Sequence, residues 1–346
     1  MLESEFYGTV CSGAGFNKKE GDFFSEENIN FVKKEIFDNC KRMNLDQSNL
    51  QDKIVMNIGS GREALGLMQF KPKKIYHYDI SHSNIEAFQN ILASKNIEEH
   101  IVSKQLDLSM DKLPSSTFDF IYLHGIIQHV NDVSKAMQNI SNSLRKNGYM
   151  WFYFYRPGSL AVFLGSLQRF LLKKTDINFF KEFLKHNCSY EFANGILDDC
   201  YVPNRHLFYP RDYIKFLEHN DIEIYNDSFL IDKDKNYDFE RFHQSVIFFT
   251  KKLSSPQQKD TPCTSLDPTN EIDVLDTNHY TKEHKILEIL KLINNKDLTQ
   301  SNDINKLVLE IEIIKLDFAK KIFKKEFIEK KYINSILNNI ISHLNI

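Results

Sequence analysis

Five short apolar runs separated by helix-like segments constrain the fold of this chain more than any other feature. The runs are Lys53–Ile58, Lys74–Ile80, Ile101–Leu106, Phe118–His124 and Tyr149–Tyr155. Such runs, rich in Ile, Val, Tyr and Phe, are typical of buried strands. Strands that alternate with helices need crossover connections, so the pattern predicts a mainly parallel sheet covered on both faces.

The segments between these runs carry helical spacing and end signals. They are Glu63–Phe70, Ser83–Asn96 and Asp132–Lys146. The last places Val133, Met137, Ile140 and Leu144 on one face, with Asn131 as a predicted cap and Asn147-Gly148 as a predicted stop. Further along, a helix-like segment, Arg211–Asn220, precedes two more strand-like runs, Ile222–Leu230 and His243–Thr250.

Composition excludes several classes of protein. The 346 residues are 42% hydrophobic and 26% charged with a net charge of −3, which argues against wholesale disorder and against a surface built for nucleic acid. The first residues lack a signal-peptide pattern, and the apolar stretch Leu160–Leu172 is too short to span a bilayer. Five scattered cysteines show no zinc spacing. We expect a reduced, cytoplasmic protein with no bound metal and no stable membrane insertion, although Leu160–Leu172 could alternatively touch a membrane surface.

Glycine and proline placement divides the chain. No glycine follows Gly195, and three of the eight prolines fall in a polar stretch, 251–277, that is typical of a linker. Helical spacing returns in Lys282–Asn294 and Ile304–Leu344. The predicted parts are an N-terminal cap or lid (1–45), a core domain (46–250) with a substrate-side insertion (157–210), a linker (251–280) and a helical accessory region (281–346). That last region is a candidate for self-association into a homo-oligomer.

The ends of the predicted strands carry the candidate chemistry, because parallel sheets bind ligands outside their carboxyl ends. Gly59 and Gly61 follow the first run and allow a tight turn that a ligand can approach, although a purely structural turn fits them equally well. Asp79 ends the second run, where a carboxylate can accept hydrogen bonds from ribose hydroxyls; capping the next helix is the alternative. Asp107 directly follows the third run and places another acid at the same edge.

These residues together resemble class I S-adenosylmethionine-dependent methyltransferases of the small-molecule type. The resemblance covers about Asp52–Tyr155 and is most specific in Phe118–Tyr149, with its aspartate strand, histidine-containing turn and amphipathic helix. It implies a Rossmann-like, doubly wound α/β fold with a seven-stranded sheet whose last strand is antiparallel. It also implies S-adenosyl-L-methionine as cofactor.

The resemblance also assigns the cofactor residues. The glycine turn would face the methionine part, Asp79 the ribose with Ile80 beside the adenine, and Asp107 the adenine amino group. The full implied set is Asn57, Gly59, Ser60, Gly61, Asp79, Ile80, Asp107, Leu108, His124 and Gly125.

Two positions depart from the family pattern. The family usually has an acid where Asn57 stands and often a third glycine where Glu63 stands. Asn57 supplies no negative charge for the ammonium group of the cofactor. Glu63, or an acid from the N-terminal segment, could compensate; weakened or lost cofactor binding is the alternative.

Methyl transfer from a sulfonium requires alignment more than chemical assistance, with a general base only for hydroxyl or protonated amine acceptors. His129 is the first candidate for a base or for substrate orientation and His124 the second, with simple packing as the competing interpretation. Five further side chains could contact substrate: Tyr7, Arg156, Tyr201, Arg205 and His206. An ordinary surface contact fits Arg156 equally well, and loop anchoring fits the last three. Tyr7 would be a lid residue, with an unstructured tail as the alternative.

The sequence therefore favours O- or N-methylation of a small molecule by in-line displacement. A non-catalytic binding or scaffold protein on the same fold is the main rival, motivated by Asn57 and Glu63. A protein or nucleic-acid methyltransferase is the third possibility.

Overall fold

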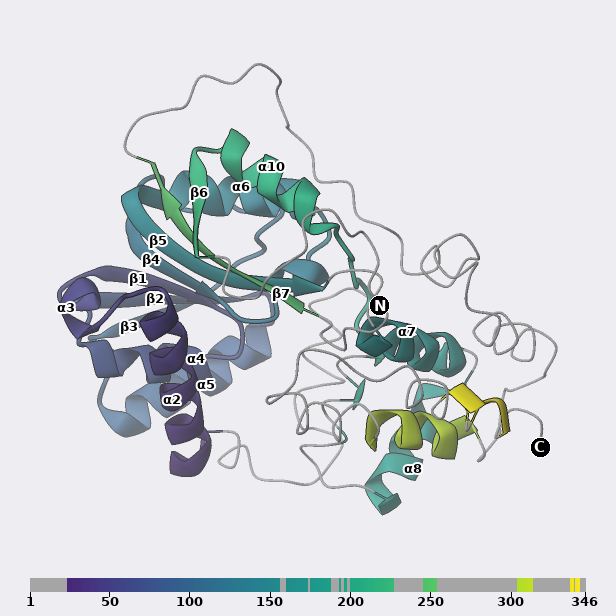
Figure 1. Ribbon diagram of the computed structural model, residues 1–346. Coiled ribbons are helices and arrows are strands. Elements are labelled where there is room, and N and C mark those ends of the chain that lie inside the picture. Colours follow the sequence, from purple (N-terminus) through teal and green to yellow (C-terminus); the bar gives the residue numbers. More distant parts are fainter. Residues whose placement is uncertain are drawn as a thin grey trace. The chain divides into compact units, whose positions relative to one another are not determined.

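The computed structural model describes most of the chain between residues 24 and 253 and two short pieces beyond it (Figure 1). The described residues are 24–155, 160–173, 175–187, 193, 196–197, 200–226, 245–253, 304–313, 337–338 and 340–342. Among the described helices, none is long and apolar enough to cross a membrane.

Seven strands form a single sheet in the order β3-β2-β1-β4-β5-β7-β6. Their bounds are β1 Ile54–Ile58, β2 Lys74–Asp79, β3 Ile101–Gln105, β4 Phe118–Leu123, β5 Leu144–Tyr155, β6 Ile222–Asn226 and β7 Ser245–Lys252. The pairs from β3 to β5 are parallel, and β6 pairs antiparallel with β7. The predicted Rossmann-like fold with a seven-stranded sheet and an antiparallel end is confirmed. Strand order reverses beside β1, so β1 and β4 diverge at the edge where such sheets bind ligands.

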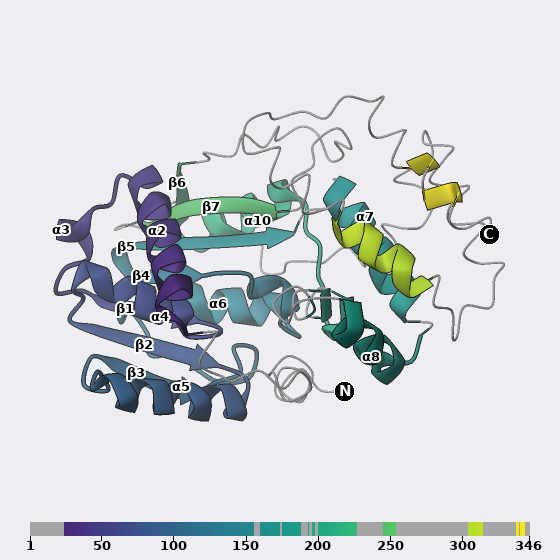
Figure 2. The ribbon, with the colours of Figure 1, turned by 90° about the horizontal axis from the view of Figure 1, so that it is seen from below.

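Helices cover both faces of this sheet (Figures 1 and 2). The helices packed around the sheet are α2 Glu26–Arg42, α3 Gln47–Leu50, α4 Arg62–Leu67, α5 His82–Lys95, α6 Val133–Ser143 and α10 Pro210–His219, with short 3-10 turns η2 Met68–Phe70 and η3 Ile127–His129. Two further helices are α7 Leu160–Leu172 and α8 Ile177–Asn187. Tyr213 of α10 stacks on Phe154, 4.0 Å between ring centroids. Side chains alternate along β5, so Trp151 lies on the opposite face.

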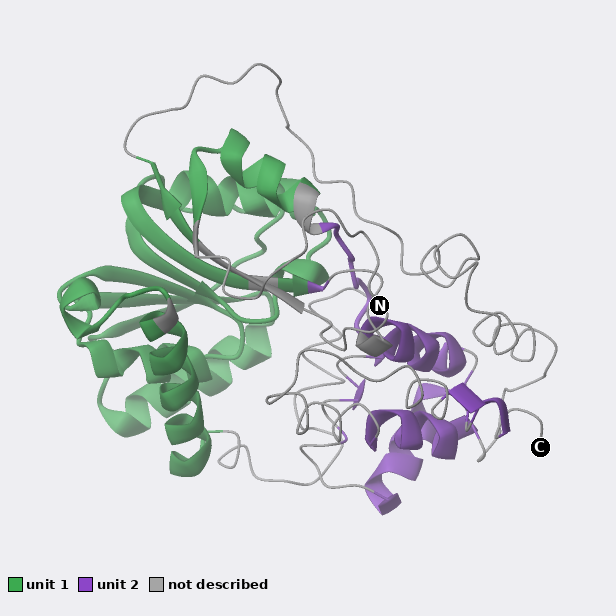
Figure 3. Ribbon diagram, viewed as in Figure 1, with its two compact units in different colours: residues 1–154, 210–231, 246–267 green, residues 155–209, 232–245, 268–346 purple. Residues whose placement is uncertain are grey.

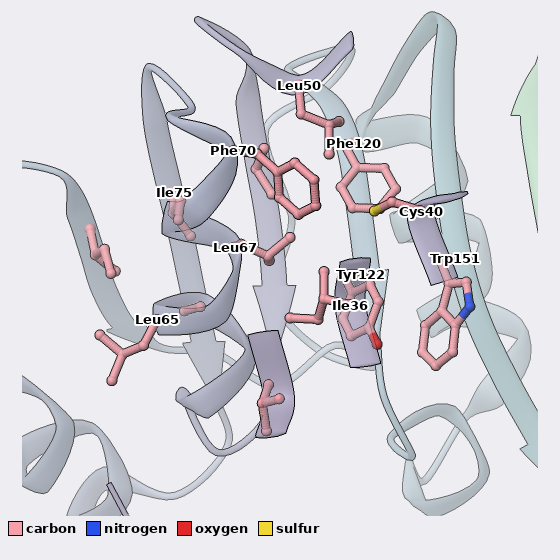
Figure 4. Packing of buried hydrophobic residues seen from close by; sticks show 14 of the residues in the cluster. Ile36, Cys40, Leu50, Leu65, Leu67, Phe70, Ile75, Phe120, Tyr122 and Trp151 are labelled. Atoms are coloured by element: carbon pink, nitrogen blue, oxygen red, sulfur yellow. The ribbon is translucent and has the colours of Figure 1, made fainter. Parts of the chain in front are cut away.

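Apolar side chains from α2, α4 and α5 bury the face that carries Trp151 (Figure 4). Ile36 and Cys40 of α2 pack there with Tyr122 and Trp151. Burial raises the pKa of the Cys40 thiol to about 12, so this cysteine is an apolar core residue in effect. The N-terminal helix α2, predicted as part of a separate cap, therefore contributes directly to the core of the sheet.

The segment after β4 differs from its prediction in both ends of the helix. Asp132, not Asn131, is the N-cap, because its side chain accepts a hydrogen bond from the Lys135 amide. The helix ends at Ser143 and β5 begins at Leu144, so the last predicted turn is strand instead. Pairing explains the difference: the register of β4 and β5 shifts near Phe118, and Arg145 reaches Asp119 at 3.1 Å.

The chain divides into two compact units (Figure 3). The first holds the sheet with α2 to α6 and α10 and comprises residues 1–154, 210–231 and 246–267. The second comprises residues 155–209, 232–245 and 268–346 and contains α7 and α8.

Within the second unit, α7 packs against the described C-terminal helical piece, 304–313. Gln168 is fully buried and donates to the carbonyl of Val308 at 3.0 Å and to Glu312 at 3.1 Å. Most apolar side chains of α7 are also buried, from Val162 to Leu172, whereas Phe170 is partly exposed. The buried side chains are unavailable for the membrane contact considered for this stretch. The predicted helix Lys282–Asn294 lies outside the described residues.

Candidate functional site

A row of polar and aromatic side chains crosses five parallel strands near their carboxyl ends. Strand register places Asn57 beside both His77 and Tyr122, His77 beside Ser103, and Tyr122 beside Trp151. Side chains in register on adjacent strands share one face of a sheet, so the row lies on the α2 side. Polar groups in a core usually need hydrogen-bond partners, and some of these groups find them within the row.

The glycine turn follows β1 directly. Gly59 has φ +122° and Gly61 has φ +87°, a region that residues with a side chain rarely adopt. The Gly59 amide donates to the carbonyl of Tyr78 on β2 at 2.9 Å. Both glycines are thus required by backbone conformation, as the sequence predicted for a tight turn.

His77 of β2 is hydrogen-bonded to the backbone of this turn. Its Nε2 lies 2.5 Å from the carbonyl oxygen of Gly59 and its Nδ1 lies 2.9 Å from the hydroxyl oxygen of Ser103. The ring is fully buried and meets the Phe88 ring edge-on at 4.5 Å. Burial lowers the pKa of His77 to about 4, so the ring is neutral at pH 7 and donates from Nε2 while Nδ1 accepts. Sequence reasoning missed this residue, because its role depends on strand register.

Alanine substitutions at Gly59 and Gly61 should reduce stability by different amounts. A Cβ on Gly61 would lie 2.7 Å from the buried Phe88 ring, whereas one on Gly59 would meet only the end of the Ile126 side chain at 3.0 Å. Both variants incur backbone strain, but only Gly61→Ala also displaces a packed ring. We expect Gly61→Ala to lower the free energy of unfolding by about 3 kcal/mol and Gly59→Ala by about 1–2 kcal/mol. Urea denaturation of both proteins measures the difference, and equal losses would contradict the packing argument.

Asp79 ends β2 beside this turn and is 7% exposed. Its Oδ1 accepts from the amide of Ser81 at 2.7 Å. Ser81, rather than Asp79, caps α5 by accepting from the Asn84 amide at 3.3 Å. Burial raises the pKa of Asp79 to about 6, although hydrogen bonds from the Ser81 amide and the Asn84 side chain act in the opposite direction. Because Ser81 caps α5, helix capping does not account for Asp79. Its buried carboxylate lies at a position that suits ligand binding.

The end of β3 contributes a second acid. Asp107 accepts from the Ser109 amide at 2.8 Å and stays partly exposed, while Leu108 is buried. Ile80, at the end of β2, is partly exposed, and its carbonyl accepts from Gln105 at 2.9 Å. The three residues that the resemblance places around adenine therefore lie at the carboxyl ends of two adjacent strands.

Asn57 is fully buried, and its amide is only half satisfied. Nδ2 donates to the carbonyl of Tyr122 at 3.3 Å, whereas Oδ1 has no hydrogen-bond partner among the described residues. An unpaired acceptor in a core is costly unless a ligand or water satisfies it. Its place directly before the glycine turn makes this oxygen a candidate ligand contact.

His124 lies between two carboxylates at the end of β4. Its Nε2 is 3.2 Å from Glu35 of α2, and its Nδ1 is 3.6 Å from Glu63 of α4. Burial alone would lower the pKa of His124, but the hydrogen bond to Glu35 and the charges of both carboxylates outweigh it, and the net shift is upward. The ring also stacks on Trp151, and Gly125 follows with φ +69°. Glu35 was not singled out from sequence because α2 is far from β4 in the chain.

His129 lies in η3 and is 5% exposed. Its Nε2 is 3.3 Å from the side-chain nitrogen of Gln128. A substrate that uses this nitrogen as a base would have to displace the Gln128 contact. The role predicted for His129 stays a prediction.

The second unit holds the described substrate candidates. The guanidinium of Arg205 is buried, lies 4.9 Å from the centre of the Tyr155 ring and packs against Gly165. Tyr201 lies 3.3 Å from the Thr175 hydroxyl, and His206 lies 6.1 Å from the Phe208 ring. These contacts suit loop anchoring, the alternative considered for each. Tyr7 and Arg156 lie outside the described residues.

The fold and the glycine turn define an α/β domain whose candidate ligand site lies at the carboxyl edge of its sheet. Residues 56–152 match the family model described as "Methyltransferase domain". This part of the sequence, from β1 to most of β5, is therefore similar to the methyltransferase domains of that family model. The cofactor of that family is S-adenosylmethionine.

Solved structures with related folds have low similarity to the chain. An S-adenosylmethionine-dependent methyltransferase from Mesorhizobium loti is 16% identical with a TM-score of 0.29, and the match covers 34% of this chain and 50% of that one. Magnesium protoporphyrin IX methyltransferase from Synechocystis PCC 6803 with bound SAH is 15% identical with a TM-score of 0.43, and the match covers 72% of this chain and 97% of that one. A putative sarcosine dimethylglycine methyltransferase from Galdieria sulphuraria is 13% identical with a TM-score of 0.39, and the match covers 64% of this chain and 72% of that one.

The chain spans about half the length of the Mesorhizobium loti structure. None of the curated proteins matches the sequence.

The residues present fit the family's cofactor. The turn after β1 has the positive φ angles that permit close approach, Asp79 offers a buried carboxylate at the end of β2, and Asn57 Oδ1 lacks a donor. In the described part of the chain, no group of three or more His, Cys, Asp or Glu residues could hold a metal ion.

Proposed function

We propose that this protein transfers a methyl group from S-adenosylmethionine to a small-molecule acceptor at oxygen or nitrogen. The observation that carries the proposal is the pairing of the glycine turn with Asp79. Gly59 is hydrogen-bonded to Tyr78, the residue before Asp79, so the two features share one edge of the sheet.

In the proposed complex, each strand end would hold one part of the cofactor. The glycine turn, with Ser60 between its glycines, would meet the methionine part, and Asp79 would accept both ribose hydroxyls. Ile80, Asp107 and Leu108 would border the adenine, and His124 and Gly125 the substrate entrance. The bound sulfonium supplies a methyl group that is already activated for displacement. The protein then has to orient the acceptor and exclude water.

The two histidines would act differently. The carboxylates around His124 favour its protonated form, so His124 suits orientation of an acceptor or of Glu63 more than proton removal. His129 stays the first candidate for a base where the acceptor is a hydroxyl or a protonated amine.

The small-molecule assignment is supported by charge. The net charge of −3 offers no electrostatic attraction for a nucleic-acid substrate. Five residues are proposed as acceptor contacts: Tyr7, Arg156, Tyr201, Arg205 and His206. We also propose a cytoplasmic protein that self-associates through its C-terminal helices, which size-exclusion chromatography with light scattering can test.

Calorimetric titration with S-adenosylmethionine and with S-adenosylhomocysteine tests the proposal. We expect micromolar binding of both ligands, and transfer of a labelled methyl group to a fraction of a metabolite pool. Binding without transfer to any small molecule, protein or nucleic acid would favour the rival, a binding or scaffold protein. If a folded protein bound neither ligand, the assignment of the cofactor would be wrong.

A further inference from the structure

The carboxylate of Glu63 is buried with unused capacity to accept hydrogen bonds. Its side chain is 7% exposed, and Oε2 accepts from the hydroxyl of Ser60 at 3.2 Å. Among the described residues, the partners of Oε1 lie beyond hydrogen-bond length, His124 Nδ1 at 3.6 Å and Arg62 at 3.9 Å. Because a carboxylate can accept about four hydrogen bonds, most of the capacity of Glu63 is open within the described structure.

A second unsatisfied acceptor flanks the same turn. Asn57 Oδ1 is fully buried without a partner among the described residues. Asn57 is the last but one residue of β1, and Glu63 is the second residue of α4. The glycine turn therefore connects the two residues. Two acceptors with spare capacity, one charged, favour a ligand group with several donors and a positive charge. A primary ammonium has three donors and no acceptor.

We propose that Glu63, assisted by the amide oxygen of Asn57, binds the primary ammonium group of an α-amino-acid moiety. The inference rests on the proposed function, because S-adenosylmethionine supplies that moiety at this turn. Glu63 is then a binding residue: its carboxylate accepts from the ammonium, and Ser60 holds the carboxylate in place. The negative charge missing from position 57 would thus come from the position where the family often has glycine.

A ligand ammonium would compete with the other charged groups around Glu63 for its carboxylate. They are His124 from the β4 end, Glu35 from α2 and Arg62 on α4. Arg62 and His124 both approach Oε1, and His124 is also held by Glu35 at 3.2 Å. Glu35 therefore shares any positive charge on His124, which leaves Glu63 able to accept the ammonium group of a ligand.

A pair of ligands that differ by one amino group tests the proposal. S-adenosylhomocysteine carries the ammonium, whereas 4-(5′-adenosylthio)butanoate lacks only that group. We expect the wild-type protein to bind S-adenosylhomocysteine at least about tenfold more tightly, as for a charged hydrogen bond. Glu63→Gln should bind the two ligands within about twofold of each other, and should leave the affinity for the analogue unchanged.

A matched control is available in the Glu86–His82 pair of α5, an exposed glutamate–histidine contact at 3.2 Å. Glu86→Gln should retain the wild-type preference. Should Glu63→Gln not fold, Glu63→Asp withdraws the carboxylate by one methylene and must reduce the preference.

The outcomes are distinct. A wild-type protein that binds both ligands equally, or a Glu63 variant that keeps the full preference, overturns the inference while leaving the cofactor in place. A loss of preference in Glu35→Gln but not in Glu63→Gln assigns the role to α2 and also overturns it. If the folded wild-type protein binds neither ligand, the proposed function itself fails.

Discussion

Asp79→Asn is expected to lower the affinity for S-adenosylmethionine at least about 100-fold while raising stability at pH 7. The loss of affinity follows from replacing a charged acceptor of two ribose hydroxyls, each hydrogen bond contributing about 1.5–3 kcal/mol. The gain in stability has a separate cause. Burial raises the pKa of Asp79 to about 6, so the charged carboxylate is disfavoured in the folded state.

The sign of the pH dependence follows from that direction. Between pH 4 and pH 6 the folded protein binds a proton at Asp79 that the unfolded chain does not, so this group's stabilisation is full below pH 4. It is lost as the pH rises through about 6. The asparagine variant has no such loss. We therefore expect the free energy of unfolding of Asp79→Asn to exceed that of the wild type by about 2–3 kcal/mol at pH 7 and to equal it near pH 4.

Urea denaturation at both pH values and calorimetric titration at pH 7 measure the two effects. Asp111→Asn is a control at the same edge of the sheet, because Asp111 accepts from the backbone amide of Asp107 and has no predicted ligand role. Unchanged affinity in a folded Asp79→Asn protein would contradict the ribose assignment. A stability loss at pH 7 would show that the hydrogen bond to Ser81 outweighs the burial of charge.

His77→Leu is expected to lower the free energy of unfolding by about 4 kcal/mol at pH 7. The substitution leaves two buried groups without their partner, the Gly59 carbonyl and the Ser103 hydroxyl, at about 1–3 kcal/mol each. It also removes the ring that packs on Phe88. Because the Gly59 carbonyl belongs to the glycine turn, affinity for S-adenosylhomocysteine should fall as well, even though both ring nitrogens of His77 are already bonded to the protein.

The pH dependence of this variant is opposite to that of Asp79→Asn. Burial lowers the pKa of His77 to about 4, so its contribution is full above pH 6.5 and is lost as the pH falls towards 4. The gap between wild type and His77→Leu should therefore narrow by about 3 kcal/mol over that range. Ser103→Ala removes only one partner and should cost about 1 kcal/mol. A His77→Leu gap that is independent of pH would contradict a neutral, buried imidazole.

The sequence by itself determined the elements of the sheet and the candidate acids at their ends. Short β-branched and aromatic runs allow little besides buried strands, and the glycines at 59 and 61 proved to have the positive φ angles that a tight turn requires. The boundary between α6 and β5 was wrong by several residues, because Arg145 pairs with Asp119 and the strand begins earlier than helical spacing predicts.

Only the tertiary structure could assign the groups that act across strands or helices. His77 reaches Gly59 and Ser103 because β1, β2 and β3 lie in register, and no local pattern contains that register. Glu35 meets His124 because α2 packs on the sheet beside β4. Sequence spacing specifies which side chains share an element. Long-range packing decides which charges meet, and therefore whether Asn57 is a defect or half of a binding site completed by Glu63.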